Sequence, residues 1–319
     1  MDYTPIPSVV PANPFDVEAD AAALRSAMKG LGTDEEAIID ILTARSNAQR
    51  QLIKEQFLRE YGRDLIEDLK SELGGKFEDV IVGLMMPPVE YLCKQLHKAM
   101  EGMGTDESTL VEILCTKSNE EMAEIVKCYE DMYDRPLAEH LCSETDGHFR
   151  RLLTLIITGV RDPVGTVDPE RAKEEAEQLY NAGESKLGTD EEVFNRILAH
   201  GSFAQLRSVF EEYKELSGQT LEQAIKHEMS GEMHEAMMAI VECVQSPAAF
   251  FANRLYNAMS GAGTEDTTLI RIIISRSEID LNNIKDEFER IYNRTLVSAI
   301  KSEVSGDYKR ALCALIGDA

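Results

Sequence analysis

The chain has 319 residues, and its 58 acidic and 33 basic residues give a formal net charge of −25. This charge argues against nucleic acid as a partner, because phosphate backbones bind basic surfaces. It also argues against direct binding to an anionic membrane unless a cation lies between them. Hydrophobic residues make up 43% of the chain, which is enough for a core, and the length suits two domains or one array of repeats.

The six cysteines form no CxxC pair and no regular framework, so free thiols are expected rather than a disulfide-stapled secreted fold. A secretory signal has a basic region followed by an apolar run, and the beginning of the chain contains no such pattern. No stretch reaches the roughly 18–20 apolar residues that span a bilayer. We therefore expect a soluble intracellular protein.

Residues 1–15 contain four of the ten prolines and are predicted to form a short extended head, because proline interrupts helices. From Asp16 the pattern becomes helical. A glycine-rich motif follows and occurs four times, as GLGTDEE, GMGTDES, KLGTDEE and GAGTEDT, starting at Gly30, Gly102, Lys186 and Gly261. An acidic residue stands at the same distance behind the threonine of each copy; these residues are Glu72, Glu144, Glu228 and Glu303.

Apolar residues recur at matched positions after each threonine, which predicts an array of supersecondary units. Each unit is expected to contain five helices: one before the glycine loop, one after it, a long third, and two more separated by the loop that carries the acid. Strand signals are almost absent, so we predict an all-α protein. The predicted boundaries are a head (1–15), repeat 1 (16–87), repeat 2 (88–159), a linker (160–170), repeat 3 (171–246) and repeat 4 (247–319).

The glycine motif suggests metal chemistry. Glycines on both sides of one variable residue permit a tight turn that points carbonyl oxygens inward. Thr33 with Glu36, and Thr189 with Glu192, fit a capping box that would start the next helix. A structural alternative is that the motif merely ends one helix and caps the next. The recurring distant acid favours a metal site, because capping needs no such carboxylate, and an all-oxygen ligand set suits calcium.

This fourfold pattern with its distant acid resembles the annexin family of calcium-dependent phospholipid-binding proteins. The resemblance implies four repeats packed into a curved, disc-like array around a central polar channel. It also implies Ca²⁺ ligands at the loop carbonyls and the distant acids: Met28, Gly30, Gly32 and Glu72; Met100, Gly102, Gly104 and Glu144; and Met259, Gly261, Gly263 and Glu303. The third repeat departs from the pattern and resembles the family's third-repeat variant, with Gly183, Lys186, Gly188 and Glu228.

The residue immediately before the last glycine of each motif is apolar, namely Leu31, Met103, Leu187 and Ala262. Single exposed apolar residues usually carry no function, but four at matched loop tips are candidates for lipid contact. Arg25 and Lys29 flank the first loop and are candidates for headgroup contact, or ordinary solvated charges.

Other chemistries find little support: the motif is not the dinucleotide fingerprint, and no EF-hand loop or zinc spacing is present. No enzyme is predicted. One interpretation is a module that binds anionic phospholipid reversibly through calcium. Such a protein would be cytoplasmic and would become peripheral at membranes when calcium rises. It would be monomeric in solution and could assemble laterally on membranes. The other is a helical scaffold for protein partners in which calcium is incidental. The full set of four acids favours the first.

One charged position breaks the repeat pattern. At matched places after the four threonines stand Asp40, Glu112, Arg196 and Arg271. The ordinary interpretation is the solvent edge of an amphipathic helix. If units two and four face each other as in annexin cores, Glu112 and Arg271 are predicted to pair as an internal latch.

Overall fold

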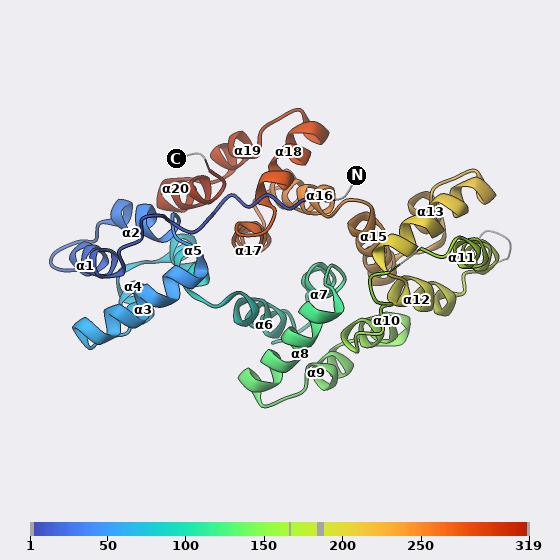
Figure 1. The fold of residues 1–319 in the computed structure, drawn as a ribbon, viewed down its shortest axis with the longest axis horizontal. Helices are drawn as coiled ribbons and strands as arrows, with labels where there is room; N and C mark the ends of the chain where they lie inside the picture. Colours follow the sequence, from blue (N-terminus) through green and yellow to red (C-terminus); the bar gives the residue numbers. More distant parts are fainter. Residues whose placement is uncertain (1–2, 166, 184–187, 318–319) are drawn as a thin grey trace. The chain divides into compact units, whose positions relative to one another are not determined.

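The protein is all-helical, as seen in a computed structural model. The structure describes residues 3–165, 167–183 and 188–317, and within these ranges it contains 20 helices and no strand (Figure 1). The helices form four successive sets of five. The predicted all-α fold of five-helix repeats is therefore confirmed.

The third helix is the longest, or equal to the longest, in the first three repeats, and the acid-bearing fourth helix is short in all of them. Repeats 1 and 2 contain α1 (Val17–Ala27), α2 (Glu35–Leu42), α3 (Asn47–Tyr61), α4 (Leu65–Glu72), α5 (Gly75–Met85), α6 (Pro88–Ala99), α7 (Glu107–Leu114), α8 (Asn119–Tyr133), α9 (Leu137–Glu144) and α10 (Gly147–Ile157). Repeats 3 and 4 contain α11 (Pro169–Ala182), α12 (Glu191–His200), α13 (Phe203–Ser217), α14 (Leu221–Glu228), α15 (Gly231–Gln245), α16 (Pro247–Ser260), α17 (Asp266–Arg276), α18 (Leu281–Tyr292), α19 (Leu296–Glu303) and α20 (Gly306–Leu315).

Local sequence explains many of these boundaries. Asp16 caps α1 by accepting a hydrogen bond from the amide of Ala19, so the helix begins where the pattern predicts. Ser46 starts α3 with a complete capping box, and Gly62 ends it in the left-handed region at φ 61°.

The chain divides into two compact units. Unit 1 consists of residues 1–91 and 251–319, and unit 2 of residues 92–250. Unit 1 thus holds repeats 1 and 4, and unit 2 holds repeats 2 and 3.

In unit 1 the fifth helices of both repeats form the core. Helix α5 packs against α17 and α20, and α20 also packs against α2 (Figure 1). Leu84 and Ile81 on α5 are fully buried. Gly83 allows the close approach of α5 to α17, because a Cβ there would lie 2.7 Å from Cδ1 of Ile274.

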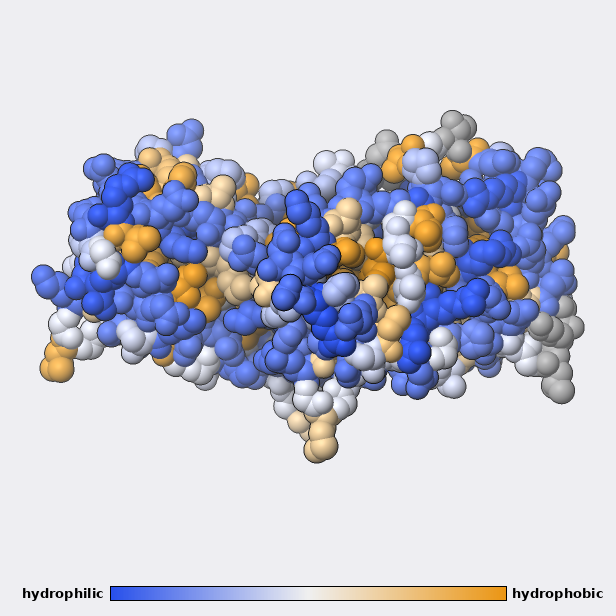
Figure 2. Space-filling view, turned by 90° about the horizontal axis from the view of Figure 1, so that it is seen from below, coloured by the Kyte–Doolittle hydropathy of each residue, from blue (hydrophilic) through white to orange (hydrophobic). Residues whose placement is uncertain are grey.

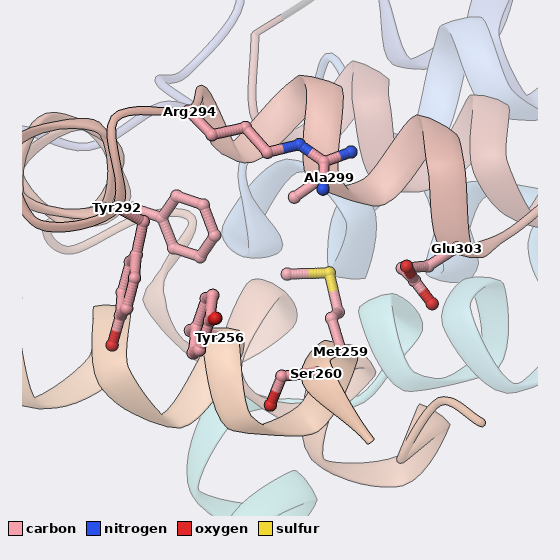
Figure 3. A pocket seen from close by; sticks show the side chains of 8 residues that line it. Tyr256, Met259, Ser260, Tyr292, Arg294, Ala299 and Glu303 are labelled. Carbon is pink, nitrogen blue, oxygen red and sulfur yellow. The ribbon is translucent and has the colours of Figure 1, made fainter. Parts of the chain in front are cut away.

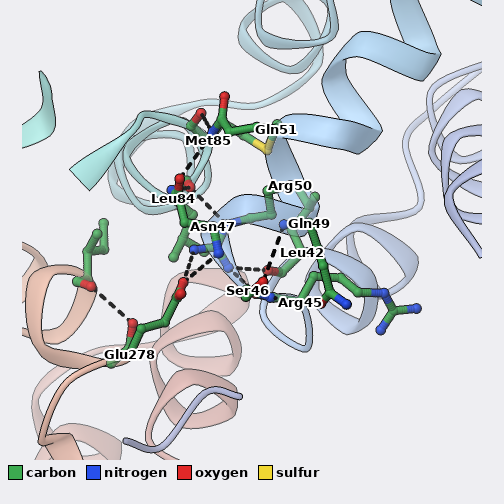
Figure 4. A network of polar contacts seen from close by, with 12 residues as sticks. Leu42, Arg45, Ser46, Asn47, Gln49, Arg50, Gln51, Leu84, Met85 and Glu278 are labelled. Carbon is green, nitrogen blue, oxygen red and sulfur yellow. Dashed lines mark hydrogen bonds and ion pairs between the residues drawn. The ribbon is translucent and has the colours of Figure 1, made fainter. Parts of the chain in front are cut away.

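A polar network also joins repeats 1 and 4 within unit 1 (Figure 4). The side chain of Arg50 donates to the carbonyl of Leu84 at 2.9 Å, and that of Asn47 donates to the carbonyl of Met86 at 2.7 Å. Glu278, two residues after the end of α17, accepts from both the Arg50 side chain and the Asn47 amide. These bonds satisfy the free carbonyls at the end of α5.

The head lies along unit 1 as an extended segment. The amides of Ser8 and Val9 both donate to the carbonyl of Ser277 at 2.9 Å, and the side chain of Asn282 donates to the carbonyl of Pro7. Residues 3–15 contain no helix, and backbone polar groups of residues 6–9 bind repeat 4.

Unit 2 is built in the same manner. Helix α10 packs against α12 and α15, and α15 packs against α7 and α13. All six cysteines of the chain are free thiols, as predicted. Burial raises the pKa of the Cys115 thiol to about 12, so this cysteine is protonated and unreactive at neutral pH.

Candidate metal centres

Each glycine motif forms a loop closed by one backbone hydrogen bond. The residue after the threonine donates its amide to an alanine carbonyl at the end of the preceding helix, at 2.8–2.9 Å in every repeat. The four bonds join Asp34 to Ala27, Asp106 to Ala99, Asp190 to Ala182 and Glu265 to Ala258. The four loops therefore share one closure.

Glycine is required by the backbone of these loops. Gly30 and Gly32 have φ of 113° and 89°, and Gly102 and Gly104 have φ of 97° and 95°. Residues with a Cβ rarely adopt these values. The fourth loop differs, since Gly263 has a positive φ whereas Gly261 does not. Its first helix, α16, continues to Ser260 and so changes the entry into the loop.

The structure brings the distant acid to the loop in all four repeats. The threonine hydroxyl donates to Oε2 of the acid at 2.7 Å in repeat 1, 3.4 Å in repeat 2, 3.1 Å in repeat 3 and 3.4 Å in repeat 4. The pairs are Thr33 with Glu72, Thr105 with Glu144, Thr189 with Glu228 and Thr264 with Glu303.

These contacts correct the prediction that the threonine caps the next helix. The N-cap of α2 is Asp34, which accepts from the Ala37 amide at 3.0 Å, and the N-cap of α12 is Asp190. Aspartate is as good a cap as threonine, and the hydroxyls of Thr33 and Thr189 bind the distant acids instead.

Each distant glutamate is the last residue of its helix, a position where a negative charge does not stabilise the helix. Glu72, Glu144, Glu228 and Glu303 are the last residues of α4, α9, α14 and α19. The helix macrodipole is negative at that end, which disfavours an anion by about 0.3–1 kcal/mol in exposed positions. A bound cation would remove this penalty, so the position fits a ligand better than it fits a structural role.

The oxygen atoms present fit calcium. Within the described ranges no group of three or more Asp, Glu, His or Cys side chains forms a metal cluster. One carboxylate for each loop leaves the other positions of a six- to eight-coordinate ion to backbone carbonyls, water or an outside anion. Such a ligand set lacks the histidine and cysteine donors that are typical of zinc sites and suits a weakly held hard cation.

The third loop is only partly described. Lys186 and Leu187, which the sequence assigns to the metal site and to lipid contact, lie outside the described residues. Gly183 ends α11, and a Cβ added there would lie 3.7 Å from Cγ of Glu228. Gly183 therefore lies beside the acid that the sequence assigns to it.

The apolar loop tips are fully solvent-exposed in the first two repeats. Leu31 has a relative exposure of 108% and Met103 of 105%, and Ala262 is also exposed. Figure 2 shows hydrophobic residues at the ends of protrusions from a largely hydrophilic surface. Lys29 is exposed, whereas Arg25 is partly buried and contacts Asp68 at 3.9 Å. Arg25 thus has a structural partner in its own repeat.

Two arginines near the distant glutamates were not predicted from the sequence. Arg135 donates to Oγ of Ser143 at 3.1 Å, and Arg294 donates to Oγ of Ser302 at 2.6 Å. Each serine immediately precedes the acid of its repeat, Glu144 or Glu303. The signal was present, because these arginines stand at matched distances from their threonines.

In repeat 4 this arginine borders a pocket (Figure 3). Tyr256 and Tyr292, whose ring centroids are 3.8 Å apart, lie on one side, and Glu303 lies on the opposite side. The side chain of Arg294 runs along the edge between them. The side chain of Met259 points into the space between them. The pocket therefore opens next to the fourth candidate metal centre.

Comparison with known proteins identifies the family. The Annexin family model matches residues 19–84, 91–156, 174–240 and 250–315. The chain is 74% identical over 321 residues to Annexin B10 of Drosophila melanogaster, with 100% of both chains covered. It matches a solved structure of annexin III with a TM-score of 0.95 and 44% identity, covering 98% of this chain and 97% of that one. It also matches a calcium-bound annexin (Sm)1 structure with a TM-score of 0.88 and 33% identity, covering 99% and 94%.

The chain therefore belongs to the annexin family. Annexins bind phospholipid membranes in a calcium-dependent way and are in general non-enzymatic membrane-binding proteins. In the part of the chain that the structure describes, no helix has the length and apolar character needed to cross a membrane.

Proposed function

We propose that this chain binds anionic phospholipid membranes through calcium ions held at its loops. The observation that carries the proposal is the contact between a loop threonine and a distant glutamate in all four repeats. A helical scaffold has no need for four such contacts. The calcium-bound form of annexin (Sm)1, a relative with 33% identity, supports the choice of metal.

The proposed ligands are those that the sequence assigns to each loop. The acid is the single charged ligand, the threonine hydroxyl orients its carboxylate, and the loop glycines permit backbone carbonyls to face the ion. When bound, calcium supplies the positive charge that links an acidic protein surface to lipid phosphate. The protein alone, with a net charge of −25, would be repelled by the same membrane.

Several weak centres acting on one surface give steep and reversible binding. Each additional loop engages at a high effective concentration once the first has bound, so membrane affinity exceeds that of any single centre. We propose that Leu31, Met103, Leu187 and Ala262 enter the lipid interface, and that Lys29 contacts headgroups. We further propose a non-enzymatic, cytoplasmic protein that organises membranes or serves trafficking, monomeric in solution and peripheral on membranes, with lateral assembly there.

Sedimentation with lipid vesicles tests this proposal. The protein is mixed with vesicles containing phosphatidylserine, or with phosphatidylcholine vesicles as a control, with calcium or with a chelator. Pelleting only with phosphatidylserine and calcium, reversed by chelation, is the expected result. Equal pelleting with and without calcium would overturn the proposal and favour the protein-scaffold alternative.

A further inference from the structure

Matching chain segments precede the first helix of repeat 1, in unit 1, and the first helix of repeat 3, in unit 2. In unit 1 the amide and carbonyl of Ala12, in the head, bind the side chain of Gln49 at 2.9 Å each. In unit 2 the amide and carbonyl of Asp168, in the linker, bind the side chain of Gln205 at 2.8 and 2.9 Å. The linker therefore has the same contact in unit 2 that the head has in unit 1.

In both units an arginine guanidinium donates to the carbonyl of the matched leucine. In unit 1 Arg50 donates through Nη1 to the carbonyl of Leu42 at 3.1 Å. In unit 2 Arg161, from the linker, donates through Nη1 to the carbonyls of Leu198 at 3.1 Å and Gly201 at 2.6 Å. Leu42 and Leu198 occupy the same position in repeats 1 and 3. A linker arginine thus replaces the helix arginine of unit 1.

In unit 1 an acidic residue, Glu278, binds this guanidinium. In unit 2 the matching residue is not acidic. Oε1 of Glu278 accepts from Nη2 of Arg50 at 2.8 Å and from the amide of Asn47, the first residue of α3, at 2.7 Å (Figure 4). The residue of repeat 2 that matches Glu278 is Asn119, whose side-chain amide donates to the carbonyl of Arg161 at 2.7 Å. Asparagine brings no negative charge to this guanidinium.

A pocket of about 200 Å³ lies at this place in unit 2. Phe203, the first residue of α13, contributes a wall, and the guanidinium carbon of Arg161 lies 4.8 Å from the centre of its ring. Val164 is 97% exposed at the rim, beside Pro163. The lining residues are Ser118, Asn119, Glu120, Arg161, Asp162, Pro163, Val164, Ser202, Phe203, Ala204 and Arg207.

Arg161 is the group in this pocket that would attract an anion, and the lining also contains two acids, Glu120 and Asp162, which bond to other groups. Asp162 lies in an ion pair with Arg171 at 2.6 Å. Glu120 is stabilised by its own backbone amide and by Ser118, which lower the pKa of its carboxyl group. Among the residues that the structure describes, Arg161 makes no ion pair. Burial lowers the pKa of its guanidinium, because desolvation outweighs its polar contacts.

We propose that this pocket binds a carboxylate carried on an apolar group, in the place that Glu278 takes in unit 1. The carboxylate would accept from the Arg161 guanidinium and from the first amide of α13, a charge-assisted arrangement at a helix N-terminus. Phe203, Pro163 and Val164 would cover the apolar part. A small organic acid and the C-terminal residue of a peptide both provide this chemistry.

Binding is tested on the full chain with phenylacetate, and with 2-phenylethanol as the uncharged analogue. The readouts are the amide NMR signals of residues 202–205 and the melting temperature in chelator, which keeps the calcium loops empty. Saturable shifts with phenylacetate only are expected. Equal effects of the alcohol, equal effects of inorganic phosphate, or no saturation would overturn the proposal. A peptide ending in phenylalanine should compete with phenylacetate when its C-terminus is free, and an amidated peptide that competes equally would contradict the role of the carboxylate.

The matched variant is Asn119→Glu, which gives unit 2 an acid at the position that Glu278 occupies in unit 1. This variant should melt at a higher temperature than the parent and bind phenylacetate at least about tenfold more weakly, because its own carboxylate fills the site. Asn119→Gln, of equal size but uncharged, should show neither effect. Unchanged phenylacetate binding by Asn119→Glu, or equal loss in both variants, would overturn the proposal.

Discussion

Thr33 donates a 2.7 Å hydrogen bond to Oε2 of Glu72, the last residue of α4, and so fixes a carboxylate beside the first glycine loop. The contacts in repeats 2 and 4 are longer: the Thr264 hydroxyl lies 3.4 Å from Oε2 of Glu303, and the Thr105 hydroxyl lies 3.4 Å from Oε2 and 3.2 Å from the backbone carbonyl of Glu144. Because the threonine does not cap the helix, its hydroxyl has one evident task, which is to orient the acid. Preorganisation of this kind improves binding by lowering the cost of ordering the ligand.

Replacement of the three threonines by valine should therefore weaken calcium-dependent membrane binding. Valine keeps the shape and removes the hydroxyl, and the calcium concentration for half-maximal vesicle binding should rise about three- to tenfold, since a hydrogen bond to a charged group is worth about 1.5–3 kcal/mol and less when exposed. The triple serine variant keeps the hydroxyl and should behave like the parent. An unchanged calcium requirement in the valine variant would show that the hydroxyl has no positioning role.

The distant acids themselves are tested by a triple Gln variant at Glu72, Glu144 and Glu303. Glutamine keeps the size of the side chain and removes the only charged ligand of each loop, so the calcium requirement for vesicle sedimentation should rise by about tenfold or more. Circular dichroism should show unchanged helix content. If the variant sediments at the calcium concentration of the parent, these residues are not calcium ligands.

A control variant with the same change in net charge separates ligation from general electrostatics. Glu55, Glu124 and Glu289 are exposed acids on the third helices of the same three repeats. Their replacement by glutamine also removes three negative charges and should leave the calcium requirement nearly unchanged. An equal effect in both triple variants would mean that overall charge controls membrane binding.

The exposed loop tips provide a test of lipid insertion. Leu31→Ser with Met103→Ser should lower vesicle binding at fixed calcium without lowering the melting temperature, because neither side chain is buried. The control is Leu58→Ser with Met132→Ser, two exposed residues on α3 and α8. Equal binding by the tip variant and the control variant would exclude insertion of the tips.

The sequence predicts much of this molecule because the repeat multiplies each local signal. One acid behind one glycine motif carries little information, but the same spacing in four copies predicts that Glu72 lies beside its glycine loop. The hydrogen bond from Thr33 to Glu72 was not predicted. The capping prediction was wrong because Asp34 follows Thr33 directly, and both residue types cap helices well. The bond of Glu278 to Arg50 joins repeats 4 and 1, and nothing in the repeat pattern indicates which residues of different repeats meet.

Stability should depend on pH through His140. Burial is the main cause that lowers the pKa of this histidine, with the positive charges of Arg135 and His97 acting in the same direction and Glu144 opposing them. Its Nδ1 also lies 2.7 Å from the hydroxyl of Tyr129. Because the folded pKa is below the unfolded value of about 6.5, protonation favours the unfolded chain, and the contribution present above that pH is lost as the pH falls.

Melting temperatures at pH 7.5, 6.5 and 5.5 in chelator measure this effect. His140→Gln should show a smaller decrease between the first and last pH than the parent, because the group that must be protonated on unfolding is absent. His227→Gln, at an exposed histidine, is the control and should keep the slope of the parent. Identical slopes in all three proteins would remove His140 as the cause.

The last prediction concerns Glu112 and Arg271, which the sequence proposes as a latch. Both side chains are buried, with relative exposures of 3% and 1%, whereas Asp40 and Arg196 at the matched positions of repeats 1 and 3 are exposed. A buried charge is retained only with a compensating partner. Removal of one member of a buried pair costs about 3–5 kcal/mol, and of an exposed pair about 0–1 kcal/mol.

If these two residues pair, Glu112→Gln and Arg271→Gln should each lower the free energy of unfolding, and the double variant should lose less than the sum of the two. The same cycle with Asp40→Asn and Arg196→Gln is the matched control and should be additive with small changes. Additivity in the first cycle as well would mean that Glu112 and Arg271 are each stabilised by other groups. The latch would then be excluded, while the calcium loops and their four acids would be unaffected.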